Sequence, residues 1–422
     1  MDPARRKLLF ASLYLSEGGP IGFIWLALPT QLRKAELPVE QIGWLMAILV
    51  LPWTFKFAWA PLIDLLQGER WKLRQWIYAS QSVMGLTLIP LLFLDPVKDF
   101  SLLSQLLLVH AFSAATQDVA IDALCISVTT PLERGSYNGW MQTGMLTGRA
   151  LMGGGGLLMA PMIGNGGVVG LLIGLTTFSM VLLWWTPQEL LKPWQDEPTA
   201  GAGARIREAG EKLVEALGSL RTWTGLGFAL LGGAAFKSVE VMYGPFLVDR
   251  GYTTEEVGGF AALPMIGLMI GGSLLGGRLA DRAGRKIGVG GALVFIACCV
   301  ACLAIGDRVM NETRGVHLLI PLAGMAFGIG VFTAASYALF MDLTEPRIAA
   351  TQFSAYMGAT NGCESWSSYT IGILTAGYGY STGMLAMAGL SLLGLIALGL
   401  TPDQRHKIEG ERLFNEGGSG EN

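Results

Sequence analysis

The sequence predicts an all-helical integral membrane protein with twelve transmembrane helices in two pseudo-symmetric six-helix bundles. Three observations support this prediction. The chain is 52% hydrophobic and 14% charged, whereas soluble domains usually carry about a quarter charged residues. Apolar stretches of about 20 residues, the length that crosses a hydrocarbon core of about 30 Å, recur between short polar breaks. The two halves of the chain also resemble each other at a fixed offset.

The apolar stretches are interpreted as helices because lipid offers no partner for free backbone N–H and C=O groups. The first stretch follows a basic start, contains Glu17 and ends without a small-residue cleavage site, so we expect a span rather than a cleavable signal peptide. The predicted spans are 8–31, 40–65, 74–95, 101–129, 137–161, 167–187, 223–248, 255–277, 287–306, 316–341, 349–375 and 379–401.

A polar insert separates the first six predicted spans from the last six. We therefore expect an N-terminal bundle at 1–187, a cytoplasmic linker at 188–222, a C-terminal bundle at 223–402 and a cytoplasmic tail at 403–422. The second part of the linker either forms an amphipathic helix on the membrane surface or is a solvated connection. Lysine and arginine are concentrated in alternate loops, with about 20 on one side and about six on the other. This asymmetry predicts that both termini are cytoplasmic.

The two halves align when one is shifted by roughly 215 positions. The segment DALCISVTTPLERGSYNGWMQTG, which starts at Asp122, aligns with YALFMDLTEPRIAATQFSAYMGA, which starts at Tyr337. This alignment places Thr129 opposite Thr344. Other matches keep the same offset and fall at equivalent span ends, which indicates a duplicated six-helix unit.

Ionisable side chains are costly in hydrocarbon, so within spans they usually face a cavity or one another. The third, sixth, ninth and twelfth predicted spans carry none in their interiors. We therefore expect those four spans to face lipid and the others to line a path for substrate and protons. The residues expected along this path are Glu17, Lys56, Asp118, Asp122, Arg149, Lys237, Glu240 and Glu364.

Depth along each helix, at about 1.5 Å per residue, places charges of opposite sign at matching levels. The contacts predicted in this way are Glu17–Lys56, Asp118–Arg149 and Lys237–Glu364. Each pair either takes part in transport or is a structural ion pair between two helices. Gly153–Gly156 either allow close helix packing or loosen their helix so that it bends.

Asp118 and Asp122 stand at positions i and i+4, so their carboxylates point to nearly the same side of one helix. Two acids in a poorly solvated site can share a proton, which favours proton coupling. The alternative is that Asp122 caps polar groups near the cytoplasmic end of its helix.

The segment GRLADRAGRK, residues 277–286, lies between the eighth and ninth predicted spans. It fits the pattern G-x-x-x-D-R-x-G-R-K that marks the major facilitator superfamily, which the chain therefore resembles. The glycines permit a tight turn, the acid can accept hydrogen bonds at a helix start, and the basic residues favour the inner membrane face. The residues expected to form a cytoplasmic latch are Asp64, Gly277, Asp281, Arg282, Gly284, Arg285 and Lys286. The first-half counterpart around Asp64 is degenerate.

Three further segments, LPWTFKFAWAPLID, SAATQDVAIDAL and PLERGSYNGW, resemble the muropeptide permease (AmpG-like) branch of this superfamily. That branch includes the acetyl-CoA solute carriers and is similar to certain siderophore importers. In the branch, a lysine and acids of these segments are implicated in transport, which here implies Lys56, Asp64, Asp118 and Asp122. The resemblance also implies a location in the bacterial cytoplasmic (inner) membrane.

These observations together predict a secondary active transporter working by alternating access around a site near the middle of the membrane. We expect proton-coupled import of an anionic or carboxylate-bearing solute, with a muropeptide-like solute as the first hypothesis. A siderophore or acyl-CoA type carrier and a non-transporting membrane sensor are the alternatives. The expected partners are the solute, protons and the lipid bilayer, with no nucleic acid, and the protein is expected to be a monomer.

An enzyme is not expected, because the chain contains no HExxH zinc motif. The three histidines are too dispersed for a metal cluster, and the five cysteines all fall within apolar spans. The prediction is therefore that the protein uses no metal and no cofactor.

Overall fold

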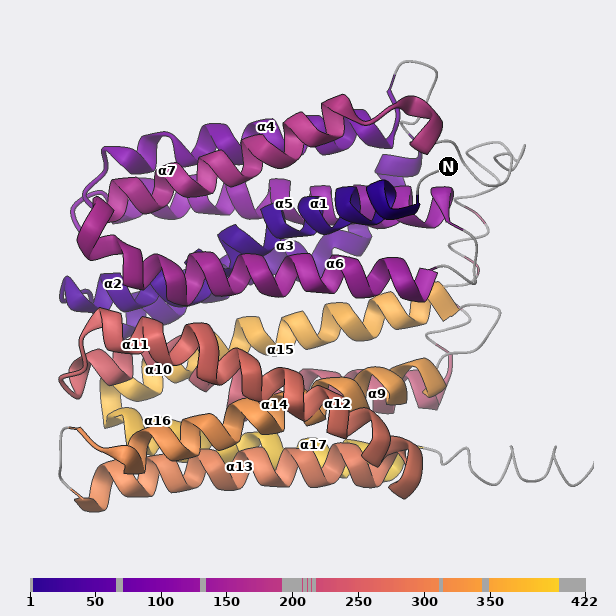
Figure 1. The fold of residues 1–422 in the computed structure, drawn as a ribbon. Coiled ribbons are helices and arrows are strands. Elements are labelled where there is room, and N and C mark those ends of the chain that lie inside the picture. The colour runs from indigo at the N-terminus through magenta and orange to yellow at the C-terminus, as the bar shows by residue number, and fades with distance from the viewer. Residues whose placement is uncertain are drawn as a thin grey trace, which may run out of the picture.

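The computed structural model is a bundle of helices that run roughly parallel to one common axis, as Figure 1 shows. The structure describes residues 3–65, 71–129, 134–191, 218–310, 314–343 and 349–401, together with positions 207, 211 and 214. The first half of the chain forms one side of the bundle and the second half forms the other. The residues described contain helices and connecting turns but no strand.

The helices of the first half follow the six predicted spans. Three successive elements form one continuous first span, and one long helix joins the fifth and sixth spans across a kink at Gly164, whose φ is 72°. The elements are α1 (Pro3–Gly22), η1 (Phe23–Ala27), α2 (Leu28–Lys34), α3 (Val39–Leu65), α4 (Leu73–Leu88), η2 (Pro90–Leu92), α5 (Phe100–Val128), α6 (Arg134–Arg149), η3 (Ala150–Gly154), α7 (Gly155–Trp185) and η4 (Gln188–Leu191).

The second half repeats this arrangement. Its first span is divided between two helices, and its second span, unlike that of the first half, contains a short π-helical segment. The elements are α9 (Leu220–Leu231), α10 (Ala234–Asp249), α11 (Thr254–Phe260), η5 (Ala261–Met265), α12 (Ile266–Ala283), α13 (Arg285–Met310), α14 (Val316–Leu343), α15 (Ala349–Tyr378), α16 (Tyr380–Leu392) and α17 (Gly394–Leu400).

Eight helical stretches of the described chain are long and apolar enough to cross a membrane. One of them, Trp140–Trp185, covers two predicted spans. The first, third and eleventh predicted spans are helical too but are not among the eight: α4 has 16 residues, and α1 and α15 are less apolar along their length. The predicted all-helical fold is confirmed.

Backbone conformation supports the predicted duplication. Glu36 and Gly251 both have positive φ, at 65° and 85°, and each follows the first span of its half. Gly164 and Gly379 both have positive φ, at 72° and 83°, and each lies between the last two spans of its half. Both pairs keep the offset of roughly 215 positions seen in the sequence. The two halves therefore share turns as well as helices.

The four spans without interior charges occupy the outside of the bundle. Figure 1 shows α4 and α7 along one outer edge, and α13, α16 and α17 along the opposite edge. The helices that carry ionisable residues lie between these edges. This placement agrees with the expectation that the four spans face lipid.

The two halves meet most closely at one end of the bundle. We call this the far end; it carries residues 35–38 and 250–253, and the opposite linker end carries the start of α1 and the end of α12. Here α2 packs against α10 and α7 against α11, while α3 runs along α15. An added Cβ at Gly154 would lie 2.6 Å from backbone atoms of Gly258 and Ala262. Only a glycine allows this approach.

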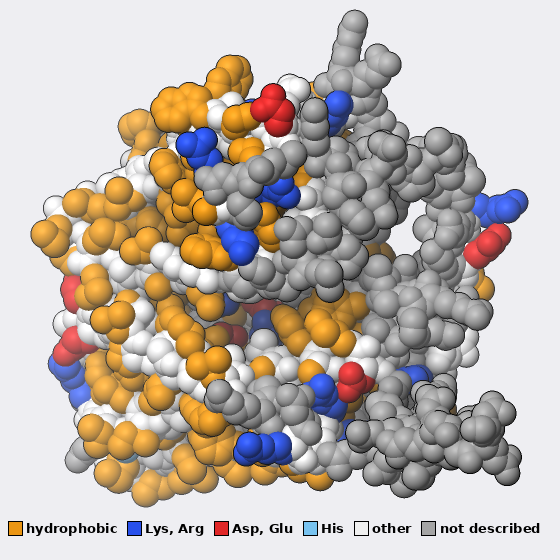
Figure 2. Space-filling view, turned by 45° about the vertical axis from the view of Figure 1, so that its right-hand side comes forward, with side chains coloured by type: hydrophobic (Ala, Val, Ile, Leu, Met, Phe, Trp, Pro, Cys, Tyr) orange, Lys and Arg blue, Asp and Glu red, His pale blue; other side chains and the backbone are white. Residues whose placement is uncertain are grey.

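The linker end is hollowed. Figure 2, turned so that this end comes forward, shows a recess between the two halves with basic and acidic side chains at its base. The structure is thus closed between the halves at the far end and open toward the linker end.

Candidate functional site

The charged residues of the first half meet in one group, which we call the Lys56 cluster: Tyr14, Glu17, Lys56, Asp118 and Asp122. Nζ of Lys56 lies 2.5 Å from Oδ2 of Asp118. The hydroxyl of Tyr14 donates to Oδ1 of Asp122 at 2.6 Å and lies 3.2 Å from Oδ1 of Asp118. The i, i+4 spacing of the two acids on α5 therefore does place both carboxylates on one side, toward α1 and α3.

Glu17 completes the Lys56 cluster from α1. Its side chain is almost fully buried, and Oε2 has no hydrogen-bond partner among the described residues. It lies within electrostatic range of Lys56, Asp118 and Asp122. The cluster thus sets three carboxyl groups against one ammonium group. Because uncompensated buried charge is costly, the cluster is neutral only when two of its carboxyl groups hold protons.

A second group, which we call the Lys237 cluster, joins the two halves: Trp25, Lys237 and Glu364. Lys237 of α10 forms an ion pair with Glu364 of α15, as predicted from their matching depth. Nε1 of Trp25, from the first half, donates to the other carboxylate oxygen of Glu364. Glu364 therefore uses both of its oxygens, and Lys237 has its counterion beside it.

The other two predicted ion pairs are wrong. Lys56 pairs with Asp118 rather than Glu17, and Asp118 does not meet Arg149. Depth along a helix predicts the level of a side chain but not the direction in which it points. Since α3 packs along α5 whereas α5 and α6 touch little, Asp118 is within reach of Lys56 and out of reach of Arg149.

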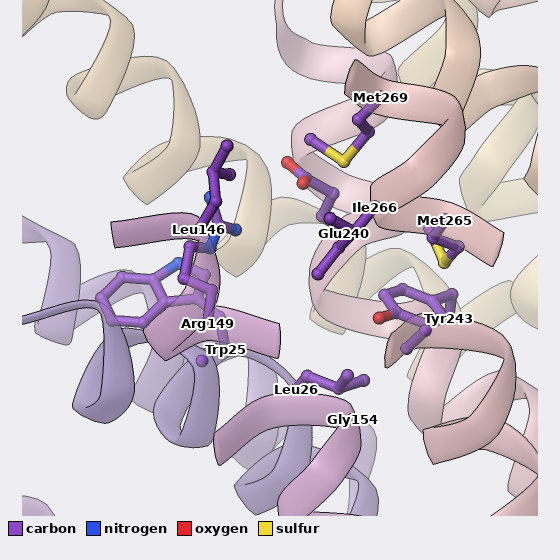
Figure 3. A pocket seen from close by; sticks show the side chains of 12 residues that line it. Trp25, Leu26, Leu146, Arg149, Gly154, Glu240, Tyr243, Met265, Ile266 and Met269 are labelled. Carbon is purple, nitrogen blue, oxygen red and sulfur yellow. The ribbon is translucent and has the colours of Figure 1, made fainter. Parts of the chain in front are cut away.

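A pocket between the two halves contains the remaining two predicted residues, Arg149 and Glu240. The empty space in this pocket, including its open mouth, is about 620 Å³. Figure 3 shows Arg149 on one wall and Glu240 with Tyr243 on the other. The remaining lining is mostly apolar: Gly22, Trp25, Leu26, Leu146, Gly154, Ala261, Met265, Ile266 and Met269.

Every π-helical segment in the described residues contributes to this pocket. Trp25 and Leu26 lie in η1. Gly154 is the last residue of η3, which begins directly after Arg149. Ala261 and Met265 lie in η5. A π-helical turn holds one residue more than an α-helical turn needs, and such turns often mark functional sites. The prediction that Gly153–Gly156 pack closely is confirmed at Gly154, and the same segment also departs from the α-helix.

At the far end, a network of polar side chains joins the halves. Nε of Arg33 in α2 lies 2.7 Å from Oδ1 of Asp249 in α10. The hydroxyl of Tyr380 donates to Oδ2 of the same aspartate at 2.9 Å. Nearby, Arg250 pairs with Asp307 within the second half. The Arg33–Asp249 pair therefore spans the interface that is closed here.

The segment predicted as a latch forms the turn between α12 and α13. Gly284 has a φ of 97°, a conformation that strongly favours glycine. Arg285 pairs with Asp342 of α14 at 3.1 Å, and Nζ of Lys286 donates to the carbonyl of Thr401. These contacts all lie within the second half, and Arg282 is exposed. The predicted latch positions Asp64, Gly277 and Asp281, the tail at 403–422 and most of the linker lie outside what the structure describes in detail.

Sequence reasoning missed Tyr14, Trp25 and Tyr243. Tyr14 stands three residues before Glu17, and Tyr243 three residues after Glu240, so each shares a helix face with a predicted acid. That spacing could have indicated them. Trp25 had no comparable signal, because it reaches its partner across the interface between the halves. Among the described residues, no group of three or more histidine, cysteine, aspartate or glutamate side chains could hold a metal ion.

Comparisons with known proteins agree with this architecture. The model of the Major Facilitator Superfamily matches residues 10–368. The anhydromuropeptide permease of Escherichia coli (strain K12) is 24% identical over 406 residues, covering 93% of this chain and 79% of the permease.

Solved structures share the fold at low sequence identity. The D-xylose-proton symporter has a TM-score of 0.76 at 11% identity, with 95% of this chain and 98% of that chain covered. A bacterial homolog of the human lysosomal transporter Spinster, in an inward-facing and unoccupied conformation, has a TM-score of 0.73 at 16% identity, with 95% and 97% covered.

Proposed function

The chain belongs to the Major Facilitator Superfamily, and we propose that it imports a carboxylate-bearing solute together with protons. It is a transporter rather than an enzyme, as its relatives and its fold are those of transporters. Anhydromuropeptides are the first class of solute that we propose, because a permease for them is similar over nearly the whole chain. We further propose that the protein acts as a monomer in a bacterial inner membrane.

The observation that carries proton coupling is the excess of acids in the Lys56 cluster. Glu17, Asp118 and Asp122 share one ammonium group, so a change in the position of Lys56 changes how many protons the three acids hold. Lys56 and Asp118 keep part of their side-chain surface exposed, at 27% and 10%. Protons could thus exchange at this cluster while the solute occupies the pocket that contains Arg149 and Glu240.

The open recess favours an inward-facing state. We propose that the linker end is cytoplasmic, because the basic loops of the sequence lie on this side. The far-end contacts, including Arg33–Asp249, would then close the outer side. Transport would proceed as the two halves rock around the pocket, opening the far end and closing the linker end, where the 277–286 turn would act as the latch.

Purified protein in liposomes tests this proposal. With a labelled anhydromuropeptide outside and acidic medium outside, we expect accumulation several-fold above that without a pH gradient, and loss of accumulation in Asp118→Asn. Glu40→Gln, at an exposed far-end position, is the control. Equal uptake with and without the pH gradient would contradict proton coupling. Accumulation of an iron chelator or an acyl-CoA instead would replace the proposed solute, and binding without flux would indicate a sensor.

A further inference from the structure

The pocket between the halves contains two opposite charges, Arg149 and Glu240, that make no direct ion pair among the described residues, although Arg149 and Lys237 both lie within electrostatic range of Glu240. Neither the guanidinium of Arg149 nor the carboxylate of Glu240 has a hydrogen bond or ion pair within the described part of the chain. They face each other from opposite walls, and the rest of the pocket lining is mostly apolar and aromatic (Figure 3). This differs from the Lys56 and Lys237 clusters, in which each lysine has its counterion in contact.

Half-buried charged groups normally find partners, because removing them from water without a hydrogen bond is costly. If Arg149 and Glu240 served only to hold the two halves together, a direct contact would satisfy both. Their separation across a pocket instead leaves an anion-binding group and a cation-binding group available to a ligand. A ligand that bridges them must carry both a negative and a positive group.

We propose that this pocket binds a zwitterionic end group, with a carboxylate on Arg149 and an ammonium on Glu240. This inference rests on the proposed transport function and names the chemistry of its solute. The planar guanidinium suits two-point binding of a carboxylate. The hydroxyl of Tyr243, on the same wall as Glu240, is placed to add a hydrogen bond. The methionines and the Trp25 ring would cover the rest of the solute, and such side chains adapt to irregular shapes.

The zwitterion would also link the halves, because Arg149 belongs to the first half and Glu240 to the second. A ligand bound at both ends would draw the two walls together. An anion alone would occupy only the first half. The inference therefore predicts that both charges of the solute are needed for tight binding.

The test uses an anhydromuropeptide whose stem peptide ends in a diamino acid, so that a free ammonium lies near a free carboxylate. Its N-acetylated form lacks the ammonium, and its amidated form lacks the carboxylate. Binding to the purified full-length protein is measured by titration calorimetry. We expect the parent compound to bind about tenfold or more tightly than either derivative.

Variants assign each charge to its residue. Glu240→Gln should weaken binding of the parent but leave the N-acetylated form unchanged, and Arg149→Gln should weaken the parent but leave the amidated form unchanged. Retained binding of the matching derivative also shows that each variant is folded. Glu40→Gln and Arg308→Gln, at exposed positions, should bind all three compounds as the unaltered protein does.

Two results would overturn the inference, and they differ. If the three compounds bind equally, or if each variant weakens all of them equally, the zwitterion site is wrong while muropeptide transport stands. If none of the three compounds binds or is transported, the proposed muropeptide function fails, and the inference fails with it.

Discussion

Nζ of Lys56 and Oδ2 of Asp118 lie 2.5 Å apart, and Tyr14 approaches the other oxygen of the same carboxylate. The pair joins α3 to α5 near the middle of the first half. Glu17 and Asp122 lie beside it, so any change at this pair alters the charge of the whole cluster. Substitutions at this pair can therefore show whether its effect on stability is separate from its effect on transport.

Replacing either partner of this pair should destabilise the protein. Lys56→Met leaves three acids without a counterion in a low-dielectric interior, and Asp118→Asn removes the carboxylate in direct contact with Lys56. We expect Lys56→Met or Asp118→Asn to cost about 3 kcal/mol each, and the double variant to cost less than their sum by about 1 to 3 kcal/mol. Thermal unfolding in detergent measures this. The exposed Lys98–Asp95 pair, changed in the same way, should show additive effects. Additivity at Lys56 and Asp118 would mean that the contact contributes no coupling energy.

Tyr14→Phe removes the hydroxyl that donates to Asp122 at 2.6 Å. We expect a stability loss of about 1 kcal/mol, since one hydrogen bond is lost and the ring stays in place. Uptake driven by a pH gradient should fall more than solute exchange without a gradient, because the change acts on a proton-carrying group. Tyr369→Phe, at an exposed position, is the matched control. Equal losses in both assays would place Tyr14 outside proton coupling.

Arg33→Gln breaks the ion pair with Asp249 that spans the closed far end. Both side chains are partly exposed, at 27% and 19%, so the pair should contribute about 1 kcal/mol or less. The ratio of protein with an open far end to protein with a closed far end should therefore rise by up to roughly fivefold. Electron spin resonance distances between labels at Ala35 and Val316, with Cys298 and Cys302 replaced, should show a larger long-distance fraction. An unchanged distribution would show that other contacts hold this end closed.

Gly154→Ala introduces a methyl group 2.6 Å from backbone atoms of Gly258 and Ala262. Backbone atoms cannot rotate away as a side chain can, so the two halves must separate locally. We expect the same spin labels to report a larger shift than Arg33→Gln produces, with lower transport. Gly174→Ala, in the next span along the chain and with no atoms within 4 Å of the added methyl, should change neither property. A normal distance distribution in Gly154→Ala would contradict close packing at this position.

Much of the fold was predictable because a bilayer restricts the choices. Apolar stretches of sufficient length must be helical, and the predicted spans agree with the observed helices to within a few residues at most ends. The absence of charge from four spans predicted their outer position. The pairing of Lys237 with Glu364 also followed from depth, because α10 and α15 are in contact.

The arrangement within the site was less predictable, for a definite physical reason. Rise per residue gives the level of Lys56, but the rotation of α3 and the identity of its neighbour decide that it meets Asp118. The partnership of Trp25 with Glu364 depends on the contact between halves, which the pattern within one helix does not contain. The extra residue of a π-helical turn does not change the hydropathy pattern, so η1, η3 and η5 could not be predicted from the sequence.

The π-helical segments η1, η3 and η5 are places where individual helices can change conformation within an otherwise rigid bundle. When a helix returns from π to α geometry, the surplus residue moves on by one turn and the side chains ahead of it swing around the helix axis. Such a shift needs no unfolding and disturbs few hydrogen bonds. Shortening η3 by one residue should therefore rotate Arg149, at the end of α6, relative to α7, while leaving the outer helices and their lipid-facing surface as they are.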